Sequence, residues 1–317
     1  MVYGKNKSYV SKEQRGKGAV KILVTGAWKC TSEQLNQIES MGHSVVFMRN
    51  EKDEVPCSYE EVEGVICNGL FLSHPIEKFI SLRYIQLTSA GFDRVPMDYV
   101  QAQGIAIYNA RGVYSIPMAE FAISGVLQLY KQSKFFYENQ KRSVWEKHRG
   151  LLELYGKTVC IVGCGNVGTE CAKRFSIFGC KVIGVDLFLR EDVAYEKMYA
   201  LESLDEALSQ SDVVVLTLPL TEETRYMINE QRFAKMKNGS VLVNIARGAV
   251  VDEQALLNVI DEKLLGAVLD VFEEEPLSLD NPLWQKENVI LTPHNSFVGD
   301  GNTERLKKVI LRNLKEE

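Results

Sequence analysis

Ionisable side chains follow three apolar runs that are typical of buried β-strands. Arg247 follows SVLVNIA, and His294 follows NVILTP. Asp270 closes GAVLD, with Glu275 a few residues further on. Ligands of an open parallel sheet bind beyond the carboxyl ends of its strands, so this topology predicts that these residues share one crevice. Together they offer a permanent cation, an imidazole that can move a proton, and a carboxylate that can orient the imidazole.

A glycine-rich segment, GCGNVG at residues 163–168, begins where the apolar run TVCIVG ends and opens a helical pattern. Glycines are needed there because side chains would hold the backbone away from a pyrophosphate at the positive helix N-terminus. Asp186 ends the next apolar run, 18 residues after Gly168. A carboxylate at this position can accept both ribose hydroxyls and would repel a 2′-phosphate. The pattern predicts NAD, with NADP less favoured and kept open by the nearby Arg190.

The two sets of residues suit one reaction if they meet in one crevice. Arg247 can grip a carboxylate with its planar fork and polarise a neighbouring carbonyl. His294 can donate a proton to the carbonyl oxygen as a hydride arrives from nicotinamide, while Glu275 orients the ring and favours its protonated form. The residues therefore favour reduction of a 2-oxo acid at C2, with His294 as the base in the reverse direction.

Each of these residues also has a simpler interpretation. The glycines could form a tight turn without a ligand, Asp186 could be a solvated acid or a helix cap, and a methyltransferase could also place an acidic strand end after a glycine loop. An isolated arginine is usually a surface residue, a glutamate in the run 273–275 is usually solvated, and a histidine after proline often caps a carbonyl. The order and context of the whole set favour a site, and a methyltransferase does not explain Arg247, Glu275 and His294.

Strand-like and helix-like segments alternate along the chain, which predicts a parallel α/β architecture. The first series contains a strand at 21–26, a helix that Thr31 or Ser32 caps and that stops before Gly42, and strands at 43–48, 63–68 and 83–89. The second series contains six strands, at 158–163, 181–186, 212–218, 240–245, 266–271 and 288–293. One helical pattern from 116 to 145 lies between them, either as a buried connection or as a contact with a second subunit, and a last helix at 302–314 could return to the first domain.

Composition limits the partners and the compartment. The 317 residues exceed one core of about 150 residues, so two domains are expected. A net charge of −5 gives no basic field for nucleic acid. Seven cysteines, an odd number without a CxxC pair, suit reduced thiols in the cytoplasm. Residues 1–20 read as a flexible tail rather than a signal or anchor, no apolar stretch reaches the ~20 residues of a membrane span, and no metal site is predicted.

Several segments resemble the signature segments of the D-isomer-specific 2-hydroxyacid dehydrogenases. They are NIARGAVVDEQAL, GAVLDVFEEEPL and LTPHNS, and LPLTEETRYMI and MKNGSVLVN resemble the stretch that joins them. The resemblance runs from about Gly91 to Asn313. It implies a doubly wound dinucleotide-binding domain at 109–296, inserted in a smaller flavodoxin-like α/β substrate domain made of 21–108 and 297–317. It also implies a homodimer that acts on a small-molecule 2-oxo or 2-hydroxy acid.

The resemblance assigns roles to individual residues. Arg247, Glu275 and His294 would form the catalytic triad, and Asp270 would bind the nicotinamide carboxamide. The segment resembling SAGFD would hold the substrate carboxylate on the backbone of Ala90 and Gly91. Tyr114 would touch the substrate or simply pack at a helix start. The complete predicted cofactor-binding set is Gly163, Gly165, Asn166, Val167, Gly168, Asp186, Leu218, Pro219, Thr224, Ile245, Ala246, Arg247, Asp270 and His294.

Three features separate the sequence from some relatives. Formate dehydrogenases have glutamine where Glu275 stands. Phosphoglycerate dehydrogenases usually carry basic residues in a loop that here reads CNGLF at 67–71. A wall of Leu70 and Phe71 in this loop would suit a carbon side chain better than a phosphate. The chain also stops soon after Leu314, without a regulatory domain. The expected activity is an NAD-dependent D-2-hydroxyacid dehydrogenase. A phosphoglycerate dehydrogenase remains the alternative within the class, and an NAD(H)-sensing protein with vestigial catalysis is the alternative outside it.

Overall fold

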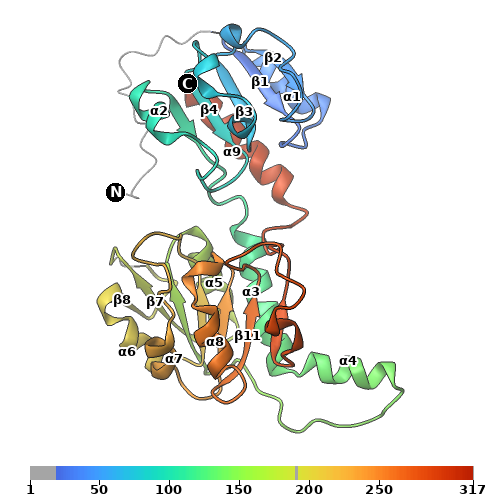
Figure 1. Ribbon diagram of the computed structural model, residues 1–317, viewed down its shortest axis with the longest axis vertical. Coiled ribbons are helices and arrows are strands. Elements are labelled where there is room, and N and C mark those ends of the chain that lie inside the picture. The colour runs from blue at the N-terminus through green and yellow to red at the C-terminus, as the bar shows by residue number, and fades with distance from the viewer. Residues whose placement is uncertain (1–18, 190–191, 317) are drawn as a thin grey trace. The chain divides into compact units, whose positions relative to one another are not determined.

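The computed structural model describes residues 19–189 and 192–316 in two compact units (Figure 1). The smaller unit ends at Val113 and resumes at Gly299, and the larger unit is Tyr114–Val298. The borders expected from the sequence were 108/109 and 296/297. Most of the expected N-terminal tail lies outside the described residues, but Val20 is buried and its carbonyl accepts the N–H of Ser44.

The smaller unit is built on one five-stranded parallel sheet with the order β2-β1-β3-β4-β5. Its elements are β1 Lys21–Thr25, α1 Ser32–Ser40, β2 Ser44–Met48, β3 Gly64–Cys67, β4 Tyr84–Leu87, α2 Met97–Ala102, β5 Ala106–Tyr108 and α9 Asn302–Glu316. Thr31 caps α1 through a capping box with Gln34. This strand order is that of flavodoxin-like sheets, so the predicted class of this domain is confirmed.

The C-terminal helix α9 belongs to the smaller unit, although about 190 residues separate it from that unit's other elements along the chain. It buries Leu306, Ile310 and Leu314. The Nδ2 of Asn313 donates to Oε1 of Gln86 in β4 at 2.8 Å, and both side chains are buried. The last helix thus packs on the sheet of the smaller unit.

The larger unit is a seven-stranded parallel sheet with the order β12-β11-β10-β9-β6-β7-β8. The strands are β6 Thr158–Val162, β7 Lys181–Asp186, β8 Lys197–Ala200, β9 Val213–Leu216, β10 Ser240–Asn244, β11 Leu264–Leu269 and β12 Val289–Leu291. The chain reverses its direction of strand addition between β6 and β9, which is the doubly wound arrangement. Six of these strands match the sequence-based prediction; the seventh, β8, is an edge strand of sequence KMYA without a continuous apolar run.

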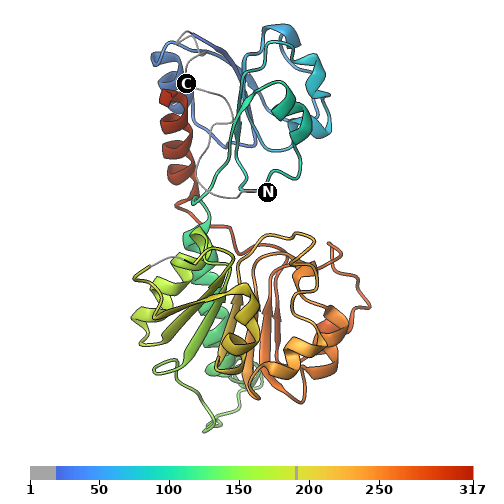
Figure 2. The same cartoon turned by 90° about the vertical axis from the view of Figure 1, so that its left-hand side faces the viewer.

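Helices cover both faces of this sheet (Figure 2). The covering helices are α3 Ser115–Tyr130, α5 Asn166–Ile177, α6 Leu204–Ser209, α7 Glu230–Lys235 and α8 Glu253–Val259; the unit also contains α4 Ser133–Lys141. Residues of α3 and α5 share one buried cluster with the strands, and residues of α6, α7 and α8 share another. No helix in the described part of the chain is both long and apolar enough to cross a lipid bilayer.

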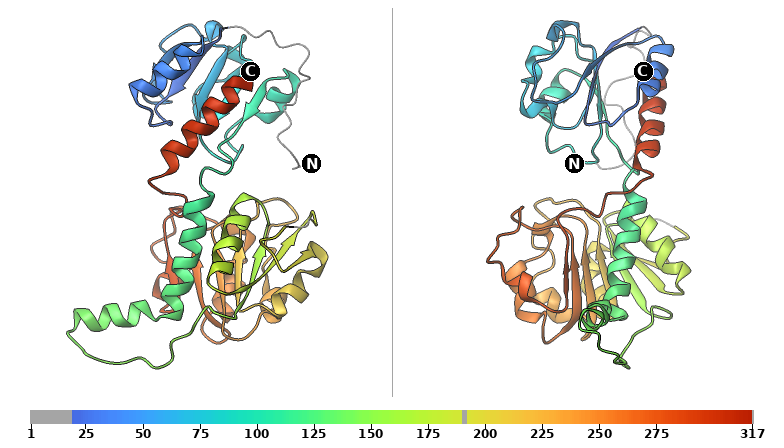
Figure 3. Two further views of the ribbon diagram at one scale, coloured as in Figure 1. Left: turned by 180° about the vertical axis from the view of Figure 1, so that it is seen from behind. Right: turned by 90° about the vertical axis from the view of Figure 1, so that its right-hand side faces the viewer.

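The single helix expected from 116 to 145 is wrong in its extent. Gln132 has a left-handed backbone with φ of 52° and separates α3 from α4. After this break α4 points away from the sheet of its own unit (Figure 3). The segment that follows α4 leaves Trp145 98% exposed. Sequence periodicity continued through the break because one left-handed residue interrupts a helix without changing its composition.

All seven cysteines are free, and five of them are buried. Burial raises the pKa of the Cys180 thiol to about 11 and that of Cys171 to about 12. These thiols therefore stay protonated at neutral pH and act as small core side chains.

Candidate active site

The glycine loop joins β6 to α5 in a conformation that depends on its glycines and leaves the space beside Gly165 open. Gly163 has φ of +93°, and a Cβ built on it would lie 2.8 Å from the backbone nitrogen of Leu218. A Cβ on Gly168 would lie 2.2 Å from the carbonyl oxygen of Gly163. A Cβ on Gly165, the N-cap of α5, would meet no atom within 4 Å. Asn166 and Val167 form the first turn of α5, so the positive N-terminus of this helix lies at the glycine loop.

Asp186 lies at the end of β7, beside the glycine loop. Its Oδ2 accepts the N–H of Cys164 at 2.7 Å, and its Oδ1 accepts the N–H of Phe188 at 3.1 Å. These bonds fix the carboxylate next to the loop, where the sequence placed the ribose. Arg190, which kept NADP open, lies outside the described residues.

The loop after β9 carries Leu218, Pro219 and Thr224. Leu218 is buried against Gly163, and Thr224 closes the loop by donating its hydroxyl to the carbonyl of Pro219 at 2.8 Å. Thr217, which the sequence analysis did not single out, donates its hydroxyl to the carbonyl of Gly163 at 2.6 Å. Thr217 could have been found from the sequence, because it is a threonine at the end of a strand predicted to lie in the same sheet as the glycine loop.

Arg247 follows β10 on a turn held by Asn244. The side chain of Asn244 accepts the N–H of Ala246 at 3.1 Å and donates to the carbonyl of Arg247 at 2.9 Å. Ile245 and Ala246 are buried, whereas Arg247 is exposed. This arrangement anchors the backbone of the turn in the core, and Nη1 of the Arg247 guanidinium donates to the carbonyl of Ala246 at 2.7 Å.

The turn that carries Arg247 is packed against the segment that leads to Glu275. A Cβ built on Gly248 would lie 1.9 Å from the carbonyl carbon of Phe272 and 2.3 Å from the nitrogen of Glu273. Only glycine permits this approach of two backbones. The loops after β10 and β11 are therefore in direct contact.

His294 and Glu275 form a direct pair. The Nδ1 of His294 lies 2.9 Å from Oε2 of Glu275, and Oε1 of Glu275 accepts the N–H of Phe272 at 3.0 Å. The side chains are 42% and 36% exposed, so a ligand can reach them. Because Glu275 holds Nδ1, the proton that His294 can exchange with a ligand is the one on Nε2.

Asp270 organises the loop on which His294 lies. Its side chain is fully buried, its Oδ1 accepts the hydroxyl of Thr292 and the N–H of Asn295, and its Oδ2 accepts the N–H of Ser296. Its carbonyl oxygen accepts the N–H of His294 at 2.7 Å. His294 itself has φ of +50°, a backbone state that costs a non-glycine residue about 1–3 kcal/mol unless its surroundings impose it. The predicted contact of Asp270 with nicotinamide stays a prediction.

An aromatic side chain that the sequence analysis missed links Tyr114 to His294. The ring of Phe297 is edge-on to His294, with centroids 6.2 Å apart, and edge-on to Tyr114 at 5.8 Å. Burial raises the pKa of the Tyr114 phenol, which therefore stays neutral at physiological pH. Tyr114 thus lies one ring away from the His294–Glu275 pair. An aromatic residue three positions after the histidine was the signal in the sequence.

Ala90 and Gly91 lie in the smaller unit, in the loop after β4. The carbonyl of Ala90 accepts the side-chain N–H of Asn109 at 2.6 Å, and the carbonyl of Gly91 accepts the hydroxyl of Ser89 at 3.2 Å. Both loop carbonyls are therefore tied to side chains of the same unit.

The wall expected from Leu70 and Phe71 is wrong in part. Leu70 is fully buried in the core of the smaller unit, and Phe71 packs against that core while only partly buried. Leu70 begins a 3-10 turn, Leu70–Leu72, which turns its side chain inward. It therefore cannot line a ligand site.

Comparisons with known proteins agree on one family. The model of the D-isomer specific 2-hydroxyacid dehydrogenase NAD binding domain matches residues 123–296. The chain is 33% identical over 278 residues to the glyoxylate reductase of Korarchaeum cryptofilum, covering 83% of this chain and 84% of that protein. It is 33% identical over 310 residues to the D-3-phosphoglycerate dehydrogenase of Methanocaldococcus jannaschii, covering 94% of this chain and 59% of that protein.

A solved structure extends the similarity to the whole fold. A D-isomer specific 2-hydroxyacid dehydrogenase family protein from Aeromonas salmonicida superposes with a TM-score of 0.81 at 30% identity. The superposition covers 93% of this chain and 94% of the other, so it includes elements of both units.

Proposed function

The chain belongs to the D-isomer-specific 2-hydroxyacid dehydrogenase family and is an NAD-dependent oxidoreductase of that class, and from this premise we propose how its own residues act. It transfers a hydride between nicotinamide and C2 of a small D-2-hydroxy or 2-oxo acid. The observation that carries this proposal is the 2.9 Å contact between His294 and Glu275 on a loop that touches the turn of Arg247.

Bound nicotinamide supplies or accepts the hydride, and the chain manages the charge and the proton. In reduction, negative charge develops on the C2 oxygen, and His294 neutralises it by donating the proton from Nε2. Glu275 stays bonded to Nδ1 and so keeps the ring oriented during that transfer. In oxidation the proton returns from the hydroxyl to Nε2. Within the larger unit, Arg247 binds the substrate carboxylate and Tyr114 contacts the substrate. For the smaller unit, the family resemblance assigns a contact with the substrate carboxylate to the backbone N–H groups of Ala90 and Gly91.

A panel assay tests this proposal. Purified protein is mixed with NADH or NADPH and a series of 2-oxo acids, including glyoxylate, pyruvate and hydroxypyruvate, and nicotinamide absorbance is followed. We expect turnover with at least one unphosphorylated acid. Tight NADH binding with no turnover on any acid would instead support the NAD(H)-sensing alternative. A preference for 3-phosphohydroxypyruvate would support the phosphoglycerate dehydrogenase alternative.

The position of Asp186 favours NAD as the cofactor. Its carboxylate is fixed beside the glycine loop and would repel the 2′-phosphate of NADP. Asp186→Asn keeps the size of the side chain and removes its charge. We expect the ratio of kcat/KM for NADPH to that for NADH to rise about tenfold.

Asp205→Asn is the matched control, because Asp205 is an exposed carboxylate on α6 that pairs with Arg232 at the surface. It should leave the NADPH to NADH ratio unchanged. Equal ratios in the wild type and in Asp186→Asn would remove Asp186 from the selection of the cofactor.

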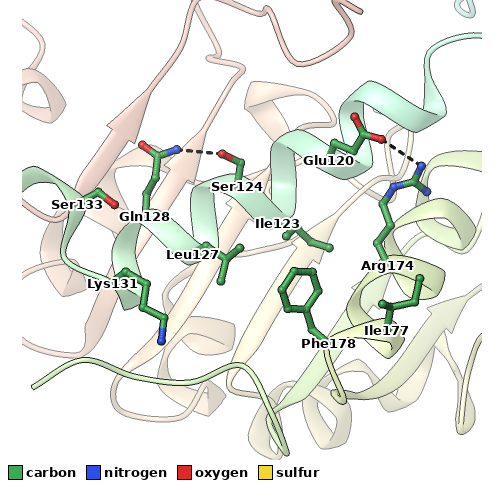
Figure 4. Close-up of a pocket in the computed structure, with 10 residues that line it drawn as sticks. All are labelled: Glu120, Ile123, Ser124, Leu127, Gln128, Lys131, Ser133, Arg174, Ile177 and Phe178. Carbon is green, nitrogen blue, oxygen red and sulfur yellow. Dashed lines mark hydrogen bonds and ion pairs between the residues drawn. The ribbon is translucent and has the colours of Figure 1, made fainter. Parts of the chain in front are cut away.

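A groove on the surface of the larger unit supports a homodimer. It has a volume of about 490 Å³ and lies between α3 and α5. Figure 4 shows Ile123 and Leu127 of α3 facing Phe178 in this groove, with Ile177 at its edge. Ile177 is 83% and Phe178 43% exposed, and a contiguous apolar surface of this kind commonly marks a protein interface. A second copy of the chain is the occupant we propose.

Ile177→Asp is expected to convert the dimer to a monomer, because it places a charge at the apolar groove without disturbing the core. Light scattering after size-exclusion chromatography measures the mass. Leu279→Asp is the control, since Leu279 is 96% exposed and is not among the residues that line the groove. A monomeric wild type, or a dimeric Ile177→Asp variant, would contradict this interface.

The free, mostly buried cysteines fit a reducing compartment, so we place the protein in the cytoplasm.

A further inference from the structure

Glu51 is held at the carboxyl edge of the sheet of the smaller unit by several hydrogen bonds. Its Oε1 accepts the hydroxyl of Thr25, at the end of β1, at 2.8 Å and the N–H of Asn68 at 2.7 Å. Its Oε2 accepts the N–H of Gly69 at 2.7 Å. The backbone carbonyl of Glu51 lies 2.9 Å from Nε2 of His74. Both the backbone and the carboxylate of Glu51 are therefore fixed.

The two backbone donors to Glu51 form an anion-binding concavity. Asn68 and Gly69 are consecutive, and they immediately precede the 3-10 turn Leu70–Leu72. Successive N–H groups that point to one place bind anions such as phosphate or carboxylate. In this chain the carboxylate of Glu51 occupies the concavity, so the loop presents a negative charge at a place that could otherwise bind an anion.

This concavity lies beside the proposed site of the substrate carboxylate. Cys67 at the end of β3 pairs with Leu87 at the end of β4, and the N–H of Thr88 donates to the carbonyl of Cys67 at 2.8 Å. Neighbouring strands are about 4.8 Å apart, so the loops that begin at Asn68 and Thr88 start side by side. Ala90 and Gly91 follow in the second of these loops. The concavity therefore lies on the loop that starts next to the one proposed to hold the substrate carboxylate.

We propose that Glu51 is a specificity determinant that excludes substrates with a second acid group, namely a phosphate, sulfonate or distal carboxylate, in favour of substrates with an uncharged side chain. This inference rests on the proposed function and names the substrate class of the same site. It replaces the predicted apolar wall as the reason for disfavouring phosphorylated acids, because a fixed negative charge repels a second anion directly.

A cationic side chain passes the same loop. A Cβ built on Gly69 would lie 3.5 Å from Oε2 of Glu51 and 3.6 Å from Cδ of Arg94. Removing the charge of Glu51 would therefore leave two N–H donors beside an arginine, which is a combination that binds phosphate. Loss of the negative charge of Glu51 should therefore allow substrates with a second acid group to bind.

The test compares Glu51→Gln with Glu54→Gln on two substrates that differ only by a phosphate group, hydroxypyruvate and 3-phosphohydroxypyruvate. Glu54 is an exposed acid of the same loop, and its substitution removes the same charge from the same segment. In Glu51→Gln we expect the ratio of kcat/KM for the phosphorylated to the free acid to rise about tenfold, mainly through KM. In Glu54→Gln the ratio should change less than about twofold, because its charge is solvent-screened.

Glu51→Asp separates charge from hydrogen bonding. It keeps the carboxylate but shortens the side chain, so we expect it to retain the wild-type ratio even if its overall activity falls. A purely structural role for Glu51 would lower activity on both substrates and leave the ratio unchanged in every variant. That outcome would overturn the proposal.

Two further measurements cover the remaining outcomes. If the wild type turns over no 2-oxo acid, the proposed function fails, and titration calorimetry with inorganic phosphate then tests the role of Glu51. Phosphate binding that is about tenfold tighter in Glu51→Gln than in the wild type would support the proposal for Glu51. Equal binding of phosphate to both proteins would overturn it. If Glu51→Gln does not fold, Leu72→Lys replaces it, because Leu72 is 70% exposed and lies next to Gly69. A ratio that this added positive charge leaves unchanged would also overturn the proposal.

Discussion

Replacing His294 by asparagine should lower kcat by about 10²- to 10⁴-fold, the contribution of a positioned general acid–base residue. Asparagine is the sharpest substitution because His294 has φ of +50°, and asparagine tolerates a left-handed backbone better than most residues. The loop held by Asp270 should therefore keep its shape. Only the proton donor at Nε2 is lost.

The measurement pairs turnover of the best 2-oxo acid with NADH binding followed by fluorescence. NADH binding should stay close to that of the wild type, because the glycine loop and Asp186 are untouched. Asn295→Ala is the control variant and should keep near-normal turnover. Residue 295 contacts Asp270 through its backbone N–H, and alanine retains this hydrogen bond. Near-normal turnover in His294→Asn would remove His294 from the proton-transfer step.

Replacing Arg247 by lysine should lower kcat/KM by about tenfold to a hundredfold, because lysine keeps the charge but loses the two-pronged grip on a carboxylate. Arg247 is exposed on a turn whose backbone is held by Asn244, so the substitution should leave the fold intact. Most of the loss should be specific to the acid substrate, and the affinity for NADH should change much less.

The matched control is Arg225→Lys, which alters an exposed arginine that pairs with Glu273 at 2.9 Å on the neighbouring loop. Steady-state kinetics with the acid as the varied substrate measure both variants. Full catalytic efficiency in Arg247→Lys, or an equal loss in both variants, would show that Arg247 is not the residue that clamps the carboxylate.

Most of the sheet framework could be predicted because buried parallel strands are continuous β-branched runs. Every residue of β9 and of β10 is buried, and both strands were visible as such runs. The edge strands β5 and β8, of sequence AIY and KMYA, contain no continuous β-branched run, so they carry no comparable signal. The break at Gln132 depends on one backbone angle, which no residue type at that position announces.

The site could be predicted where it depends on strand ends and not where it depends on loop geometry. The parallel topology brought Glu275 and His294 together, as expected from the ends of β11 and β12. Three contacts depend on how the loops fold back. They are the hydrogen bonds of Asp270 to its neighbouring loop, the contacts of the Phe297 ring with Tyr114 and His294, and the hydrogen bonds of Glu51 with Asn68 and Gly69. Hydrophobic patterns contain no information on such contacts.

The place of α9 has a consequence for synthesis on the ribosome. The larger unit is one continuous stretch, Tyr114–Val298, so it can fold as soon as its last strand has emerged. The smaller unit lacks the helix that covers its sheet until residues 302–316 are made, although its strands are translated first. The nascent chain therefore carries an incomplete N-terminal unit through most of translation, and the part of the protein made first is completed last.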